Sequence, residues 1–490
     1  MQEYLHGAYG KTQALGTKTA IRSRNAIVYI GTAPVHTIAG GAKCVNRPIV
    51  AANMAEARKY MGYSEDWAKY TLCEAMYAHF ENKGVGPLVL INVLDPAKHK
   101  AGEATTTRMT PANGRVVIVN AGDIILDSVK VTGKSAGTDY TAAYDAKKQV
   151  LTISETRSGS LGEEELTITY DSVDAAAVKP TDVVGATDGA GMNTGLYAIK
   201  NVYQETGFIP SFLLAPGFSS VPEVHSAMCD IGRKINSHWD AYVLADIPIV
   251  DAKQTKVTLE NAATWKETNG YNRPNETVYF PLAKGRDGKV YHLSVLAAAN
   301  LQELLTEKDG IPYRTASNTD CAVIGSLYMG EENVGRVYDD ELINNRLNKN
   351  GIASAAFVGG RWAIWGCHSA DYNAENSDQI NVSETNMMML YYISNDFQYR
   401  RTRNVDKPLT SNDIKTIVAE EQTRLDALVK IGALTYGEVH LNAEADARSD
   451  IMQGNYAFTF NVTTTPLAKS LTAIVNWTDE GFTTYFADIA

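Results

Sequence analysis

The sequence contains no apolar run long enough to cross a bilayer. Its longest apolar stretches, such as Pro87–Leu94, fall far short of the roughly 20 residues that a transmembrane helix needs. The segment Met1–Gly7 has neither the basic leader and apolar core of a secretion signal nor the Arg-rich pattern of a transit peptide. We therefore predict no membrane-spanning helix, no membrane binding and synthesis in the cytoplasm.

Cysteine and histidine are too sparse and scattered for a recognisable metal or disulfide framework. The five cysteines form no CxxC pair, and the nine histidines form neither an HExxH motif nor a His-x-His pair. A metal site would need ligands from distant segments, so we predict no metal, no cofactor and reduced, mostly buried thiols. The cysteines are Cys44, Cys73, Cys229, Cys321 and Cys367.

Positive charge is in deficit, because 45 Lys and Arg residues face 56 Asp and Glu residues and the net charge is -11. This balance opposes a polyanionic partner, so we predict no nucleic-acid binding. The chain has 490 residues, 44% of them hydrophobic and 21% charged, which are globular proportions. Its length favours roughly two to four domains.

Sequence motifs for an enzyme are incomplete. The segment Gly133–Gly137 matches the GxSxG pattern of a nucleophile elbow, but both flanks resemble strands, which favours a hairpin turn. The same Gly-Lys-Ser lacks a phosphate loop's first glycine, because Ser128 stands there. Gly189, Gly191 and Gly195 miss the dinucleotide spacing by one residue. We predict no catalytic residues, and a cytosolic α/β hydrolase with an unrecognised active site remains the alternative.

Hydrophobic periodicity predicts an α/β sheet with a β insertion. A buried strand over 26–35, a helical pattern over 67–82 and a strand over 88–94 open the chain, and helix-strand alternation resumes at Gly195. Between them, residues 101–188 carry short alternating runs separated by Gly, Asp and Ser turns, which is typical of antiparallel strands.

From residue 338 the pattern changes to an α+β module. We predict helices over 340–347, 384–398 and 411–430, and strands over 355–358, 362–367, 457–462 and 471–477. The predicted fold is therefore an α/β core interrupted by an inserted antiparallel β domain and followed by a C-terminal α+β module, with extended arms. The parts are an N-terminal arm (1–24), the core (25–100 and 189–337), the insertion (101–188), the C-terminal module (338–466) and a C-terminal arm (467–490).

Several stretches resemble the sheath proteins of contractile tails, which occur in contractile-tailed phages, R-type bacteriocins and related injection machines. Their order and spacing span nearly the whole chain. They are Tyr4–Gly7 with AIVYIGTAPV, GYSEDWAKYTLCEAM and GPLVLINVLDP; Gly310–Asn318; Asn350–Ile352 with Gly359–Trp362 and Trp365–Gly366; Val405–Leu409; and the closing AFTFNVTTTPLAKSLTAIVNW.

The resemblance implies that arms of neighbouring subunits add strands to the C-terminal module. The implied arm strands are Tyr4, Leu5, His6, Gly7, Ala8 and Tyr9 at one end and Leu471, Ala473, Val475 and Trp477 at the other, and the implied accepting edge is Ala457, Thr459 and Asn461. Many relatives carry an Arg-Arg pair where this chain has Thr385–Met387. The nearby Arg400, Arg401, Arg403 and Lys407 are the predicted tube-facing residues, although a solvated helix end explains the cluster equally well.

The implied function is a sheath subunit that stacks as hexameric rings around an inner tube and contracts from a metastable state. Its implied partners are further copies of itself, the inner tube protein, and baseplate and tail terminator proteins. It would be made in the bacterial cytoplasm and become part of a virion or bacteriocin, and the sequence leaves open which. A carbohydrate-binding surface protein is a third hypothesis, weakened by the lack of a secretion signal.

Overall fold

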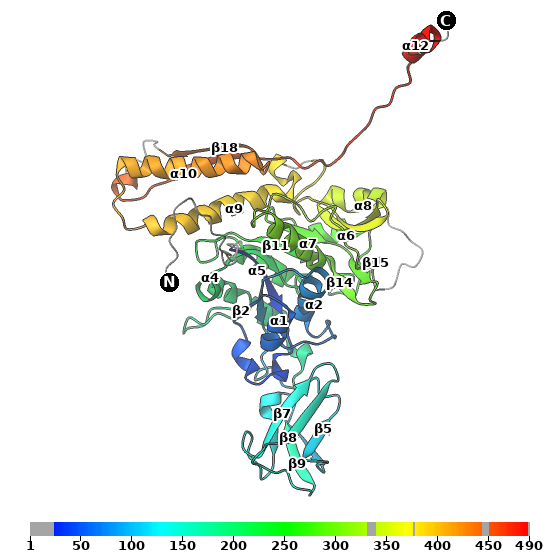
Figure 1. Ribbon diagram of the computed structural model, residues 1–490, viewed down its shortest axis with the longest axis vertical. Helices are drawn as coiled ribbons and strands as arrows, with labels where there is room; N and C mark the ends of the chain where they lie inside the picture. The colour runs from blue at the N-terminus through cyan, green and yellow to red at the C-terminus, as the bar shows by residue number, and fades with distance from the viewer. Residues whose placement is uncertain (1–23, 331–339, 376–377, 443–449, 489–490) are drawn as a thin grey trace, which may run out of the picture. The chain divides into compact units, whose positions relative to one another are not determined.

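The computed structural model describes residues 24–330, 340–375, 378–442 and 450–488 (Figure 1). The chain forms two compact units, Met1–Lys407 and Pro408–Ala490. The predicted N-terminal arm strand lies outside the described residues, and this concerns Tyr4, Leu5, His6, Gly7, Ala8 and Tyr9. Among the described residues, no helix is both long and apolar enough to span a membrane.

The first unit is built on an eight-stranded sheet with the order β17-β16-β12-β11-β10-β1-β3-β2. Six central strands are parallel to their neighbours, whereas β2 and β17 run antiparallel at the two edges. Central parallel strands are buried on both faces, which explains their continuous apolar sequences. The strands are β1 Asn25–Gly31, β2 Pro48–Ala51, β3 Leu88–Asn92, β10 Ile209–Leu214, β11 Tyr242–Asp246, β12 Glu276–Tyr279, β16 Ile352–Val358 and β17 Arg361–Trp365.

The helices of this unit pack on the large sheet, and α7 is buried along most of its length. The pattern predicted over 67–82 forms α2 and a following π-helical turn, Tyr77–Lys83. A small antiparallel sheet has the strand order β14-β13-β15; β13 and β14 precede α7 in the sequence, and β15 follows it. The elements are α1 Met54–Met61, α2 Thr71–Met76, α3 Pro180–Val184, α4 Val202–Thr206, α5 Pro222–Ile231, α6 Ala262–Thr268, α7 Leu293–Glu307, α8 Asp340–Arg346, α9 Glu384–Arg401, β13 Leu282–Gly285, β14 Val290–His292 and β15 Ile324–Tyr328.

The segment after residue 100 forms two three-stranded antiparallel sheets, β4-β9-β6 and β5-β8-β7, around an apolar cluster of its own (Figure 1). Its two ends run side by side, because Ala101 N donates to Ser172 O at 2.8 Å. Val178 and Val183 already pack in the main core, before the boundary we predicted at 188. The strands are β4 Thr105–Met109, β5 Arg115–Ile118, β6 Lys130–Val131, β7 Tyr140–Asp145, β8 Val150–Glu155 and β9 Leu166–Tyr170.

The large sheet extends past residue 337, where we predicted the α/β core to end. Strand β16 pairs with β12 in parallel through Val278 and Ile352, and β17 closes the edge. The sequence interval between β12 and β16 holds a small sheet and two helices, so local patterning did not reveal that β16 returns to the same sheet. The first unit ends at Lys407.

The second unit contains α10, a two-stranded antiparallel sheet and α12. A capping box between Thr410 and Asp413 starts α10. The strand predicted over 471–477 is absent from the structure, because those residues have no neighbouring strand to pair with there; β19 pairs instead with β18, which we did not predict. The elements are α10 Ser411–Lys430, β18 Leu434–Leu441, β19 Phe458–Thr464 and α12 Glu480–Ala487.

Candidate functional site

The crevice that α/β enzymes use for ligands is filled in this protein. Ligands of such folds bind where the strand order reverses, which here is beside β1. Thr71 at the start of α2 closes that position: Thr32 N donates to Thr71 Oγ1 at 3.3 Å, and Thr71 N donates to Thr32 Oγ1 at 3.1 Å. A Cβ at Gly31 would lie 2.3 Å from Thr71 Oγ1. The crevice therefore packs a helix against the sheet instead of a substrate.

Buried polar groups at the ends of neighbouring strands serve the fold. Asp246 accepts hydrogen bonds from the backbone N–H and the hydroxyl of Ser294, and so holds the start of α7. Burial alone would lower the pKa of His292, but its ion pair with Glu74 raises that pKa to about 9. The Ser294 hydroxyl donates its hydrogen bond to Asp246, and His292 forms an ion pair with Glu74. No neutral histidine therefore contacts the Ser294 hydroxyl to activate it as a nucleophile.

One surface pocket of about 470 Å³ lies beside α5 and α6. Its lining includes Pro222, Asp251, Trp265 and one serine, Ser220. The residues that line it, all in the described part of the chain, include no histidine or cysteine. Ser220 Oγ contacts Gly217 O at 3.4 Å, so this pocket does not supply the nucleophile and base that a hydrolase needs.

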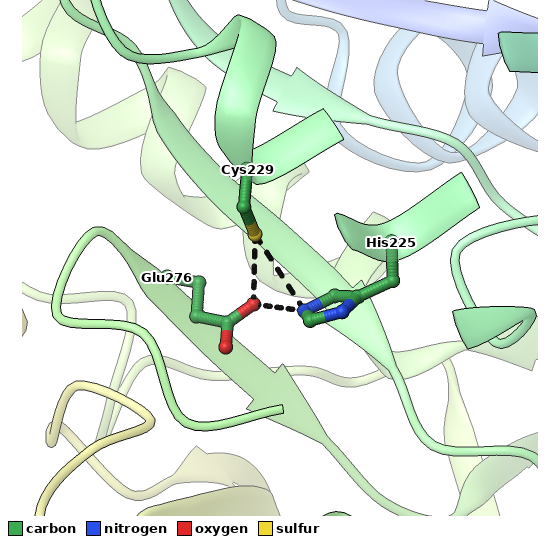
Figure 2. A group of neighbouring side chains, drawn as sticks. All are labelled: His225, Cys229 and Glu276. Atoms are coloured by element: carbon green, nitrogen blue, oxygen red, sulfur yellow. Dashed lines mark hydrogen bonds and ion pairs between the residues drawn. The ribbon is translucent and has the colours of Figure 1, made fainter. Parts of the chain in front are cut away.

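A third polar cluster joins His225 and Cys229 of α5 to Glu276 of β12 (Figure 2). Glu276 Oε2 contacts His225 Nε2, and Cys229 Sγ lies 3.2 Å from Glu276 Oε2 and 3.6 Å from His225 Nε2. A catalytic triad places its acid and its nucleophile on opposite ring nitrogens. Here both meet Nε2, and all three side chains are at most 1% exposed, so the arrangement is not a catalytic triad.

The predicted basic cluster straddles the end of α9. Arg400 is half-buried and its Nε lies 3.0 Å from Asp396 Oδ2, one turn earlier on the helix. Arg401 is also half-buried, whereas Arg403 and Lys407 are exposed after the helix ends. Asp396 thus offsets part of the cluster's charge, and the outermost cations are Arg403 and Lys407.

The accepting edge that the resemblance implied faces strand β18 of the same chain. Val439 N donates to Gln422 Oε1 at 3.1 Å, and Gln422 Nε2 donates to Gly437 O at 2.9 Å, so these two residues of β18 turn their backbone groups toward α10. Backbone hydrogen bonds alternate along an antiparallel pair, so the β18–β19 bonds fall at the pairs in between. Those pairs include His440–Thr459 and Glu438–Asn461, and Asn442 N donates to Ala457 O. The backbone groups of Ala457, Thr459 and Asn461 are therefore used within the chain, which corrects that prediction.

The residues predicted as the C-terminal arm strand form no strand within this chain, and their side chains are exposed. Leu471, Ile474, Val475 and Trp477 have 90%, 83%, 88% and 80% of their surface exposed. Ala473 is exposed as well. Such a run of large apolar side chains in water is unusual for a monomeric protein and marks an interaction segment.

Comparison with known proteins gives two curated relatives. The tail sheath protein of Burkholderia phage BcepMu is 25% identical over 507 aligned residues, which cover 97% of each chain. The major tail sheath protein of Serratia phage KSP20 is 22% identical over 320 residues, covering 64% of this chain and 76% of that protein. The predicted resemblance to contractile tail sheath proteins is confirmed. No family model matches the chain.

Solved structures share the sheath fold over nearly the full length of the chain. A chain of the anti-feeding prophage baseplate, solved by cryo-EM with 6-fold symmetry, has a TM-score of 0.55 at 12% identity and covers 98% of this chain. A chain of the PVC sheath complex in the contracted state, from an extracellular contractile injection system, has a TM-score of 0.53 at 12% identity and covers 99%. These comparisons support a structural sheath role and give no support to a hydrolase.

Proposed function

We propose that this chain is a structural subunit of a contractile tail sheath. It polymerises as stacked hexameric rings around an inner tube and contracts once from a metastable extended state, driving the tube through a target envelope. The free energy comes from inter-subunit contacts that differ between two packings, so the step needs no nucleotide. The full-length match to tail sheath proteins and the filled α/β crevice support this role.

The observation that carries the proposal is the exposed apolar segment Leu471–Trp477. Burying one large apolar side chain stabilises a complex by about 1.5–3 kcal/mol, so the segment gains several such increments when another chain covers it. Its β-branched and aromatic side chains favour a strand. We assign the covering chain to a second copy of this protein, because an isolated two-stranded sheet such as β18–β19 is marginal and gains from added strands.

We propose that such a strand adds away from β18. The Gln422 amide occupies the outer edge of β18 by bonding Val439 N and Gly437 O. An added strand therefore does not pair with β18. The N-terminal segment Tyr4–Tyr9 is the second proposed arm, contributed by another neighbour.

The proposed inner-tube contact uses the basic cluster Arg400, Arg401, Arg403 and Lys407. The net negative charge of the chain repels a long polyanion. The local group of cations can still pair with an acidic patch on a protein surface. Arg403 and Lys407 extend beyond α9 and carry the contact, while Arg400 is held by Asp396. Baseplate and terminator proteins are the proposed partners at the ends of the polymer, and the bacterial tail particle is the proposed location.

Assembly of chain variants tests the proposal. Full-length protein is expected to form large polymers, whereas chains lacking residues 1–16 or truncated after Pro466 remain folded monomers. A second pair of variants tests the segment itself. The double variant Val475→Asp/Trp477→Asp replaces two exposed apolar side chains and is expected to abolish polymerisation. The control Asn476→Asp adds a charge between these two positions and is expected to preserve polymerisation. Size-exclusion chromatography with light scattering provides the readout. Polymers of unchanged size from the Val475/Trp477 variant would refute the proposed role of the segment.

A further inference from the structure

The His225–Cys229–Glu276 cluster contains the donor atoms of a metal site and is not used by the proposed sheath function. His225 and Cys229 are four residues apart on α5, which places both side chains on one face of the helix. Glu276 begins β12 in the large sheet and is reached across the helix-sheet interface. Asn275 Nδ2 donates to Cys229 O at 3.3 Å and ties the two elements together at this point.

Three lone-pair donors converge on one point in this cluster (Figure 2). His225 Nε2, Cys229 Sγ and Glu276 Oε2 all lie within 4.8 Å of one another, and the three side chains are at most 1% exposed. A hydrogen-bond chain would pass protons from one group to the next, but here each of the three atoms contacts both of the others. Three ligand atoms this close together can share one ion after a small outward shift.

The neighbouring groups fix the ligands in place independently of an ion. Glu276 Oε1 accepts a hydrogen bond from Arg273 N at 2.9 Å, which leaves Oε2 directed at His225 and Cys229. Tyr271 stacks on the His225 ring, with the ring centroids 3.6 Å apart and the planes at 10°. The Tyr271 hydroxyl in turn donates to Ser219 O at 2.9 Å. Metal ligands in proteins are oriented by outer contacts of this kind.

We infer that His225, Cys229 and Glu276 bind one Zn²⁺ ion that links α5 to β12. Imidazole and thiolate are ligands that Zn²⁺ prefers over Ca²⁺ or Mg²⁺. A thiolate and a carboxylate neutralise a divalent cation, so the loaded site carries no net charge into the core.

The spacing fits tetrahedral Zn²⁺ once Glu276 Oε2 moves away from both other ligand atoms. Ordinary Zn–S and Zn–N bond lengths place these two ligand atoms about 3.5 Å apart. Cys229 Sγ and His225 Nε2 are 3.6 Å apart. The Glu276 Oε2 contact with His225 Nε2 widens to about 3.4 Å when the ion enters between them. Three protein ligands leave one coordination position for a water molecule.

Cobalt substitution in the full-length chain tests the site. Protein expressed in cobalt-supplemented minimal medium is expected to hold about one Co²⁺ per chain and to show a thiolate-to-cobalt charge-transfer band. The Cys229→Ser variant shows no such band, and the amount of metal bound per chain falls about tenfold. The matched control is Cys321→Ser, which alters another buried thiol that no histidine contacts within the described residues, and it retains both.

Two outcomes would overturn the inference. Wild-type protein that contains no stoichiometric zinc or cobalt and shows no band refutes the site without any variant. A band that persists in folded Cys229→Ser protein, with circular dichroism unchanged, assigns the metal to another thiol. Loss of zinc from the wild type on treatment with a strong chelator should lower its melting temperature, and an unchanged melting temperature contradicts the proposed link between α5 and β12.

Discussion

Two buried histidines, His36 and His79, are neutral in the folded chain. Burial lowers the pKa of His79 to about 3 and that of His36 to about 4. Tyr29 OH and His79 Nε2 share a hydrogen bond of 2.7 Å. In the unfolded chain both rings protonate near pH 6.5. Their contribution to stability is therefore present above pH 6.5 and is lost as the pH falls toward the folded values.

We predict that His79→Gln flattens the acid side of the stability profile. Each histidine that protonates only in the unfolded chain reduces the free energy of unfolding by about 1.4 kcal/mol per pH unit below pH 6.5. Glutamine can still accept from Tyr29 but does not titrate. Urea unfolding at several values between pH 6.5 and pH 4 should show a shallower slope for the variant. The exposed His238→Gln control keeps the wild-type slope, and parallel profiles for His79→Gln and wild type would contradict the assignment.

The proposed tube contact is also a matter of single side chains. We predict that Arg403→Glu combined with Lys407→Glu weakens association with the inner tube protein while changing the unfolding free energy by only about 0.5 kcal/mol, because both are exposed. Arg400→Glu places a second acid one turn from Asp396 and destabilises α9 instead. Co-sedimentation at low and high salt measures the contact. Unchanged binding with an unchanged salt dependence would return the cluster to a solvated helix end.

At the scale of elements, the β insertion has closely spaced ends. Lys100 and Val173 form an isolated antiparallel bridge, so a short linker can join them without moving the core. Helix α3 follows directly, and its Asp182 bonds Lys98 and His99 while Val183 is buried in the main core. The structural boundary therefore lies near 173, and Val178 and α3 beyond it stabilise the core.

We predict that replacing residues 102–171 with a short Gly/Ser linker leaves a folded chain. The ion pairs that this replacement removes at the junction, such as Lys69–Asp123, are exposed and contribute about 1 kcal/mol or less each. Replacing residues 101–188 removes α3 as well and should lower the melting temperature clearly. Thermal unfolding of the two variants compares them directly. Equal melting temperatures, or failure of the shorter replacement to fold, would refute the boundary near 173.

Elements with strong local patterns were predictable, and elements defined by distant partners were not. The apolar runs of β1 and β3 and the helix predicted over 411–430, which forms α10, were visible in the sequence. Strand β18 was missed because Gly437 interrupts the face that carries Val439 and Leu441; a Cβ at Gly437 would lie only 2.9 Å from Leu425 Cβ. The His225–Cys229 spacing was a visible signal, but Glu276 joins it through the non-local packing of α5 on the sheet.

At the scale of the whole molecule, a single subunit leaves apolar surface exposed that we expect neighbouring subunits to cover. The exposed side chains of Leu471, Ile474, Val475 and Trp477 have no role in an isolated subunit that would justify their exposure. The proposed sheath gives them one, because strands exchanged between copies keep subunits linked while their other contacts change. Backbone hydrogen bonds supply this link, and the flanking residues 465–470 and 478–479, which form no helix or strand, supply the slack.

Electron microscopy of the purified full-length chain, negatively stained, tests this central claim most directly. The account predicts long hollow tubes with a regular transverse striation, formed by the protein alone at concentrations where the chain truncated after Pro466 stays monomeric. Monodisperse single particles of full-length protein under those conditions, with no tubes or rings, would contradict it.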